Sequence, residues 1–201
     1  MNDMLADRFQ LWVDSVGGYL VCRGEKITIG QAIPAAGVDV PIMGDISRRH
    51  LSIRREGESY LLFPRGETLL DGRTAGAADY LRDGALIELT GGVKLRFRKP
   101  HPLSATARID FESRHRTQPR CDAVLLMADA AVLGPKTNAH IACRGWPAEV
   151  VLFAAREGLR VRCDRSMTID GTVRRSPAAL RHNSQVVGEG FSFSLEPVTE
   201  S

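Results

Sequence analysis

Four consecutive residues, Ser47, Arg48, Arg49 and His50, place a hydroxyl, two guanidinium groups and an imidazole close together in the chain. A phosphate dianion offers three acceptor oxygens, which guanidinium, hydroxyl and backbone N–H groups can satisfy. A hydroxyl beside an imidazole is also part of the machinery for acyl transfer. A purely structural role is equally compatible with these residues, because serine caps turns and backbone groups can satisfy a histidine.

A catalytic role needs further groups that the sequence does not supply. No carboxylate or oxyanion loop can be assigned to a Ser47–His50 dyad, and no glycine-rich loop follows a strand and opens a helix. The histidines lack ligand spacings such as H-E-x-x-H, and the cysteines lack C-x-x-C spacing. We therefore expect a protein that is not an enzyme and needs no metal or cofactor. The residues concerned are His50, His101, His115, His140 and His182, with Cys22, Cys121, Cys143 and Cys163.

Short alternating or β-branched runs recur about every ten residues and are separated by Gly, Pro, Asp or Asn. This cadence predicts an all-β sandwich rather than a helical or α/β protein. The run Val93–Arg98 alternates strictly, so its apolar residues should face a core and its arginines the solvent. The other runs are Phe9–Val13, Tyr19–Cys22, Lys26–Ile29, Leu51–Arg55, Tyr60–Phe63 and Ala85–Leu89.

The chain contains an internal repeat. Landmarks of the first half recur in the second half in the same order, which chance does not readily produce. The offsets vary little, as expected for sandwiches whose loops change length between fixed strands. The pairs are Asp71-Gly72 with Asp170-Gly171, Leu81 with Leu180 and Gly84 with Asn183, all 99 residues apart, Phe97 with Leu195, 98 apart, and Ile29-Gly30 with Leu133-Gly134, 104 apart.

A polar, basic segment separates the two halves. Residues 99–120 carry five positive and two negative side chains, a net charge of +3 that equals the net charge of the whole chain. We interpret residues 101–120 as a basic linker between two sandwich domains, 9–100 and 121–198. A phosphorylated or nucleic-acid-bound linker is the alternative, but the small overall charge disfavours nucleic acid as a partner.

The first half resembles the forkhead-associated (FHA) domain, an eleven-stranded sandwich with a Gly-Arg, Ser-x-x-His and Asn-Gly signature. The resemblance covers Phe9 to Lys99 and depends on Gly30, on Ser47 with His50, and on the later turn Asp71-Gly72. It implies that Ser47 and Arg48 contact a phosphothreonine peptide, while Gly30, His50, Asp71 and Gly72 are structural. His50 would brace the loop from beneath by hydrogen bonding.

The resemblance is partial in the first half. Gln31 stands where the family has the arginine that contacts the phosphopeptide, and Arg65-Gly66 stands near the peptide-contacting Asn-Gly. A charge-assisted hydrogen bond contributes about 1.5–3 kcal/mol, so its absence implies roughly ten- to a hundredfold weaker binding. Arg48, Arg49 or Arg65 would have to compensate.

The second half is more degenerate. Leu133-Gly134-Pro135 replaces Gly-Arg, and Gly145–Val150 replaces Ser-x-x-His, so no phosphate ligand remains. Trp146, like Trp12 in the first half, is expected at a core or domain interface rather than as a ligand platform. The sequence therefore predicts two tandem FHA-like sandwiches, of which only the first retains part of the binding signature.

Two functions follow from this reading. The first is a non-catalytic interaction module whose first repeat recognises a phosphothreonine-containing protein partner in signalling, through Ser47, Arg48, Arg65 and Gln31. The second is a structural adaptor that keeps the scaffold and has lost phosphopeptide binding.

The expected location follows from other features of the sequence. Asp3 and Asp7 argue against a signal peptide, and no apolar run reaches the ~20 residues of a membrane span. Scattered cysteines suit a reducing compartment. We expect reduced, part-buried thiols, a cytoplasmic location and no membrane partner.

Overall fold

The computed structural model describes residues 7–198, so the expectation about a signal peptide at residues 1–6 lies outside the described part. The predicted all-β class is confirmed: strands dominate, and the helical structure of the described residues is one 3-10 turn, η1 (Thr90–Gly92). Within residues 7–198 there is no helix with the length and apolar character that crossing a membrane requires.

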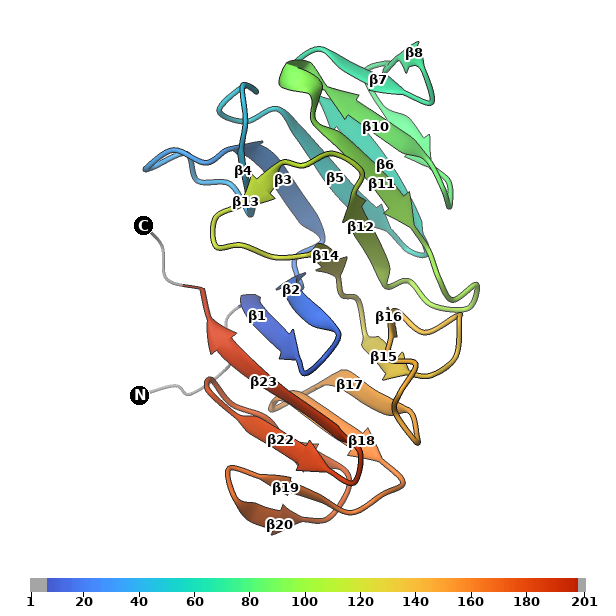
Figure 1. Cartoon of the computed structure of the whole chain (residues 1–201). Helices are drawn as coiled ribbons and strands as arrows, with labels where there is room; N and C mark the ends of the chain where they lie inside the picture. Colours follow the sequence, from blue (N-terminus) through green and yellow to red (C-terminus); the bar gives the residue numbers. More distant parts are fainter. Residues whose placement is uncertain (1–6, 199–201) are drawn as a thin grey trace.

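One twelve-stranded sheet runs through the whole molecule (Figure 1). Its strands, in spatial order, are β20 (Thr172–Arg174), β19 (Met167–Ile169), β22 (Gln185–Gly188), β23 (Phe191–Pro197), β1 (Arg8–Val13), β2 (Gly17–Cys22), β14 (Ala123–Leu126), β12 (Ala107–Phe111), β11 (Lys94–Arg98), β10 (Leu86–Leu89), β7 (Thr68–Leu70) and β8 (Arg73–Thr74).

Two smaller sheets pack against this long sheet. The six-stranded sheet is ordered β13 (Arg116–Thr117), β4 (Val40–Met43), β3 (Lys26–Gln31), β5 (Leu51–Glu56), β6 (Ser59–Pro64) and β9 (Asp79–Leu81). The five-stranded sheet is ordered β16 (Ile141–Ala142), β15 (Ala130–Gly134), β17 (Val150–Ala155), β18 (Gly158–Cys163) and β21 (Ala178–Ala179).

The strands β2 and β14 belong to both hydrophobic cores. Successive side chains of a strand point to opposite faces, and in these two strands both faces are apolar. One face packs with the five-stranded sheet and the other with the six-stranded sheet, so the smaller sheets cover opposite faces of the long sheet. The first set is Tyr19, Val21, Ala123 and Leu125, and the second is Leu20, Cys22, Val124 and Leu126.

The two halves of the chain exchange their leading strands. Outward from the central parallel pair β2–β14, the order β14-β12-β11-β10-β7-β8 on one side matches β2-β1-β23-β22-β19-β20 on the other. The last strand of the first half, β11, therefore pairs with β12, whereas the last strand of the second half, β23, pairs with β1. Each half is completed by strands that lead into the other half.

The strand pairing departs from the predicted division into 9–100, 101–120 and 121–198. The segment 101–120, expected as a linker, contributes β12 to the long sheet and β13 to the six-stranded sheet. In β12 the apolar residues Ala107 and Ile109 are buried, while Arg108 and Asp110 pair with one another on the opposite face. The charged side chains on this face explain why the sequence pattern indicates a polar linker here.

The internal repeat has the same geometry at its turns. Asp71 and Asp170 have positive φ angles of 51° and 52°. The Asp71 carboxylate accepts a hydrogen bond from the Leu86 N–H at 2.8 Å, and the Asp170 carboxylate accepts one from the Gln185 N–H at 2.8 Å. These aspartates tie the turn after β7 or β19 to the start of β10 or β22, so their role is local structure.

The shared strands predict that the two halves unfold together. Leu20→Ala, which removes a contact from the first core, should lower the free energy of unfolding by about 2–4 kcal/mol. Because β2 also lines the second core, the fluorescence of Trp146 in that core should report the same lowered denaturant midpoint as circular dichroism of the whole chain. A Trp12→Phe background isolates the Trp146 signal, and Val173→Ala, at an exposed position, is the control. Two separate transitions would contradict shared folding.

Candidate functional site

The loop between β4 and β5 is held from beneath by His50, which is fully buried. The backbone N–H of Ser47 donates to Nδ1 of His50 at 3.1 Å, so the neutral ring carries its proton on Nε2 and donates to the Glu67 carbonyl at 2.9 Å. The His50 carbonyl accepts from the N–H groups of Arg65 and Gly66, each at 2.8 Å. The imidazole thus joins this loop, residues 44–50, to the β6–β7 connection.

Two glycines allow the loop to lie close to its neighbours. A Cβ at Gly30 would be 2.0 Å from the carbonyl oxygen of Arg48, and a Cβ at Gly66 would be 2.6 Å from Cε1 of His50. Any side chain at Gly30 would lift the loop from β3. Gly134 occupies the matching place in the second half, where a Cβ would be 2.9 Å from Cγ of Glu149.

Ser47 and Arg48 are exposed on the outer side of this loop. Gln31, at the end of β3, is half-buried and binds the loop rather than solvent: its N–H donates to the Ser47 carbonyl at 3.1 Å, and its side-chain amide donates to the Gly44 carbonyl at 3.3 Å. The structure therefore brings Ser47, Arg48 and Gln31 together, with Gly30 and His50 below them.

Arg49 and Arg65 point to other parts of the surface. The Arg49 guanidinium donates to the carbonyls of Ala36 at 3.2 Å and Gly37 at 2.7 Å. Arg65 lines a separate hollow on the outer face of the six-stranded sheet, together with Lys26 and Arg54, and neither Ser47 nor Arg48 lines that hollow.

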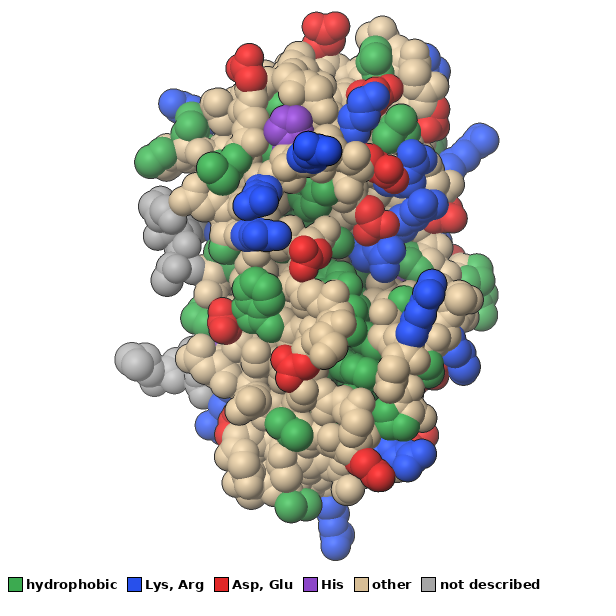
Figure 2. Space-filling model, in the orientation of Figure 1, with side chains coloured by type: hydrophobic (Ala, Val, Ile, Leu, Met, Phe, Trp, Pro, Cys, Tyr) green, Lys and Arg blue, Asp and Glu red, His purple; other side chains and the backbone are tan. Residues whose placement is uncertain are grey.

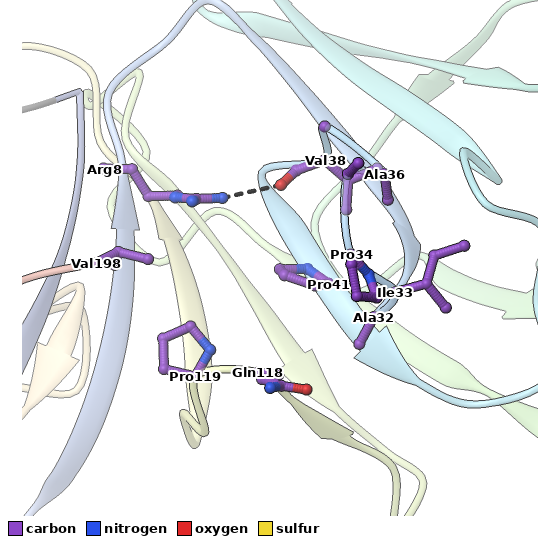
Figure 3. A pocket seen from close by; sticks show the side chains of 12 residues that line it. Arg8, Ala32, Ile33, Pro34, Ala36, Val38, Pro41, Gln118, Pro119 and Val198 are labelled. Carbon is purple, nitrogen blue, oxygen red and sulfur yellow. Dashed lines mark hydrogen bonds between the residues drawn. The ribbon is translucent and has the colours of Figure 1, made fainter. Parts of the chain in front are cut away.

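The β3–β4 loop that Arg49 fixes forms one wall of an apolar groove (Figure 3). Arg8 reaches across from β1 and donates to the carbonyls of Val38 and Asp39 at 2.9 and 3.0 Å, while Pro119 and Val198 form the facing side. Ser47 and Arg48 do not line this groove. This groove could not be predicted from the sequence, because its walls come from segments far apart in the chain.

The segment before and within β13 lies against the start of the loop. Arg116 pairs with Met43 across the β13–β4 ladder, and the His115 ring is so close to Gly44 that a Cβ there would be 3.1 Å from Cδ2. Arg114 and Arg116 are exposed. These residues belong to the segment that the sequence predicts as a linker, and their basic character is the signal that connects them with an anion site.

The matching loop of the second half, residues 143–149, has neither a serine nor a histidine, and its exposed cation is Arg144. Trp146 is buried, as predicted, and its ring lies 5.3 Å from that of Phe191. Glu149 forms an ion pair with Lys136 at 3.1 Å. Trp12, expected at a core or domain interface, is 36% exposed on β1 and donates to Glu196 of β23 at 2.9 Å, so it lies where the first half pairs with the second.

The four cysteines are buried and unpaired, as expected from their spacing. Burial raises the pKa of Cys22 far above its ordinary value and that of Cys143 to about 12. Cys22 and Cys143 therefore stay protonated at neutral pH, and all four cysteines pack as small apolar side chains.

No protein family model and no curated protein matches the chain. Among solved structures, the chain is similar to the Rv0020c FHA structure, with 26% identity over 45% of this chain and 91% of that chain and a TM-score of 0.29. It is also similar to the N-terminal FHA domain from EssC, a component of the bacterial Type VII secretion apparatus, with 13% identity over 94% of this chain and 92% of that chain and a TM-score of 0.27.

Both of these solved structures are FHA domains. In this chain the histidine of the Ser47–His50 loop holds the serine backbone, which is the bracing role that the resemblance in the sequence implies. What this loop binds is a separate question, which its own chemistry has to answer.

A second buried histidine, His140, joins the segment 101–111 to the second half. Its Nδ1 accepts from the Val132 N–H at 2.9 Å and its Nε2 bonds the Ser104 hydroxyl at 3.0 Å. Arg108 donates to the His140 carbonyl at 2.7 Å. Burial, and then the positive charges of His101 and Arg108, lower the pKa of His140 to about 4.

This lowered pKa makes the stability of the fold pH-dependent. The folded state resists protonating His140, so its contribution is complete above the unfolded-state pKa of about 6.5 and is lost as the pH falls toward 4. Between pH 7.5 and pH 5 the free energy of unfolding should fall by about 2 kcal/mol more in the wild type than in His140→Gln. Urea denaturation of both proteins at the two pH values measures this difference. An equal fall in the free energy of unfolding for the wild type and for His140→Gln would contradict it.

Proposed function

We propose that the chain is a non-catalytic protein-interaction module that binds a phosphothreonine-containing segment of a partner at loop 44–50. The observation that carries this proposal is the exposed Ser47 and Arg48 on a loop whose backbone the buried His50 holds from beneath. A hydroxyl and a guanidinium are the groups that a phosphate dianion requires.

Fixing the loop in advance supports binding. A flexible loop loses conformational entropy when a ligand orders it, and a loop that is already fixed avoids much of that cost. The backbone of this loop is hydrogen-bonded to β3 through Gln31, to the β6–β7 connection through His50 and to η1 through Thr90, whose hydroxyl donates to the Asp45 carbonyl at 3.1 Å. The exposed side chains therefore stand on a rigid support.

One observation favours an alternative function as a structural adaptor without phosphate recognition. The Gln31 amide is uncharged and already donates to the Gly44 carbonyl, so it supplies neither charge nor a free donor of the kind a phosphate needs. Under this alternative the loop is retained only because it connects β4 and β5.

Binding of a phosphothreonine peptide library, compared with the same library after dephosphorylation, separates the two functions. A preference for the phosphorylated form supports the interaction module. Equal binding of both forms, or none, would leave the adaptor.

Ser47→Ala should abolish the preference for the phosphorylated peptide, because it removes the hydroxyl while the backbone contact to His50 stays in place. We expect at least about tenfold weaker binding, the range for a lost hydrogen bond to a charged group. Titration with the library's tightest phosphopeptide measures the change. Ser59→Ala, an exposed serine at the start of β6, is the matched control, and an unchanged affinity for Ser47→Ala would contradict the site.

Gln31→Arg should strengthen binding, because it adds a guanidinium beside Ser47. The expected gain is about tenfold, as for one charge-assisted hydrogen bond. Gln31→Met, which removes the amide and adds no charge, shows how much the loss of the bond to Gly44 costs. If Gln31→Arg binds the phosphopeptide no better than Gln31→Met, then a phosphate does not sit next to position 31.

A further inference from the structure

The first half supplies few free cations to its own candidate site. Of the three arginines that could have replaced the missing charge at Gln31, Arg49 is bound to the carbonyls of Ala36 and Gly37. Arg65 lines the separate hollow with Lys26 and Arg54. Arg48 is then the one arginine of loop 44–50 that remains available, and a phosphate dianion carries up to two negative charges.

The β12–β13 segment lies directly beside this loop. Strand β13 pairs with β4 at Arg116 and Met43, one residue before the loop begins, and the His115 ring packs against Gly44. Thr117 is buried opposite Ile42, whereas Arg116 shares the outer face with Met43, which is 58% exposed. The alternation of the strand therefore presents Arg116 to solvent at the entrance of the loop, with Arg114 exposed just before it.

These arginines lack a counter-charge. Among the residues that the structure describes, Arg48, Arg114 and Arg116 have no carboxylate within 4.0 Å, as the ion pairs show. The neighbouring strands differ, because each cation of β11 and β12 is paired there: Lys94 with Glu88, Arg96 with Glu112, and Arg98 and Arg108 with Asp110.

Figure 2 shows this difference on one face of the molecule. Lys and Arg side chains over β11 and β12 are interspersed with Asp and Glu, whereas those over β13 and the loop after it lie next to one another, with an acidic side chain beside them near the start of β14. Asp45 is the one acidic side chain within loop 44–50, so the positive side chains outnumber it. An unpaired group of this sign attracts an anion and favours its encounter with the loop.

We propose that Arg114 and Arg116 complete the phosphate site of loop 44–50 and supply the positive charge that Gln31 lacks. This inference rests on the proposed function, since it assigns further ligands to the same phosphothreonine. The β12–β13 segment belongs to the strands that lead into the second half, so the site is built from both halves of the chain. Binding of a phosphorylated segment then depends on the exchanged arrangement of strands.

The test compares the double variant Arg114→Ala/Arg116→Ala with Arg174→Ala/Arg175→Ala. Both pairs are exposed and both variants remove two positive charges, but Arg174 and Arg175 lie at or just beyond β20, at the opposite end of the long sheet. Binding of the library's tightest phosphothreonine peptide is measured at low and at physiological salt. We expect at least about tenfold weaker binding and a shallower salt dependence for the first variant, and at most about a twofold change for the second. Equal thermal midpoints by circular dichroism verify that both variants fold.

Each other outcome has a definite meaning. A wild-type protein that does not distinguish phosphorylated from unmodified peptide overturns the proposed function itself. If the wild type distinguishes them and Ser47→Ala loses the preference, but the Arg114/Arg116 variant binds like the Arg174/Arg175 variant, the composite site is wrong while the function stands. If the Arg114/Arg116 variant loses affinity for a single-stranded oligonucleotide and keeps its affinity for the phosphopeptide, the inference is also wrong and the patch belongs to nucleic acid.

Discussion

The parallel pairing of β2 with β14 is the constraint on which the rest of the structure depends. Both strands are buried on both faces, so neither core can form unless the pair is in place. The register, from Tyr19 opposite Ala123 to Cys22 opposite Leu126, keeps the 104-residue offset that also relates Gly30 to Gly134. The strand order on one side of this pair matches the order on the other side, and the smaller sheets lie on opposite faces of the long sheet. The two halves therefore share one sheet and are not two separate domains joined by a linker.

The same arrangement determines what can act as a site. Loop 44–50 is rigid because His50 and Gln31 bind its backbone, and those bonds use up the side chains nearest to Ser47. Positive charge reaches the loop from β13, a strand that exists only because the chain returns from β12 past β4 before entering β14. In the second half the corresponding loop contains Trp146, whose ring packs on Phe191, so an apolar contact takes the place that Ser47 has in the first half.

Much of the fold could be predicted from local pattern. The strand cadence indicated the all-β class, and the turns at Asp71 and Asp170 revealed the repeat. The exchange of leading strands could not be predicted, because alternation shows which face of a strand is buried and not which strand lies beside it. The segment 101–120 was misread for a related reason: Arg108 and Asp110 neutralise each other on the outer face of β12, a pairing that a sequence does not display. The Ser47–His50 loop was found, whereas Arg65 was assigned to it by sequence position and its side chain lies elsewhere.

The pairing of β1 with β23 also has a consequence for how the protein is made. Phe9 lies opposite Pro197, so β1 gains its second neighbour, β23, only after the long stretch of chain between the two strands has been synthesised. During translation β1 and β2 have a hydrophobic face and an unpaired edge, which are the features that make nascent chains associate wrongly. Contacts between such distant positions also raise the contact order, which slows folding. The close turn that joins β1 to β2 lets the two strands cover each other's inner edge until the last strand arrives.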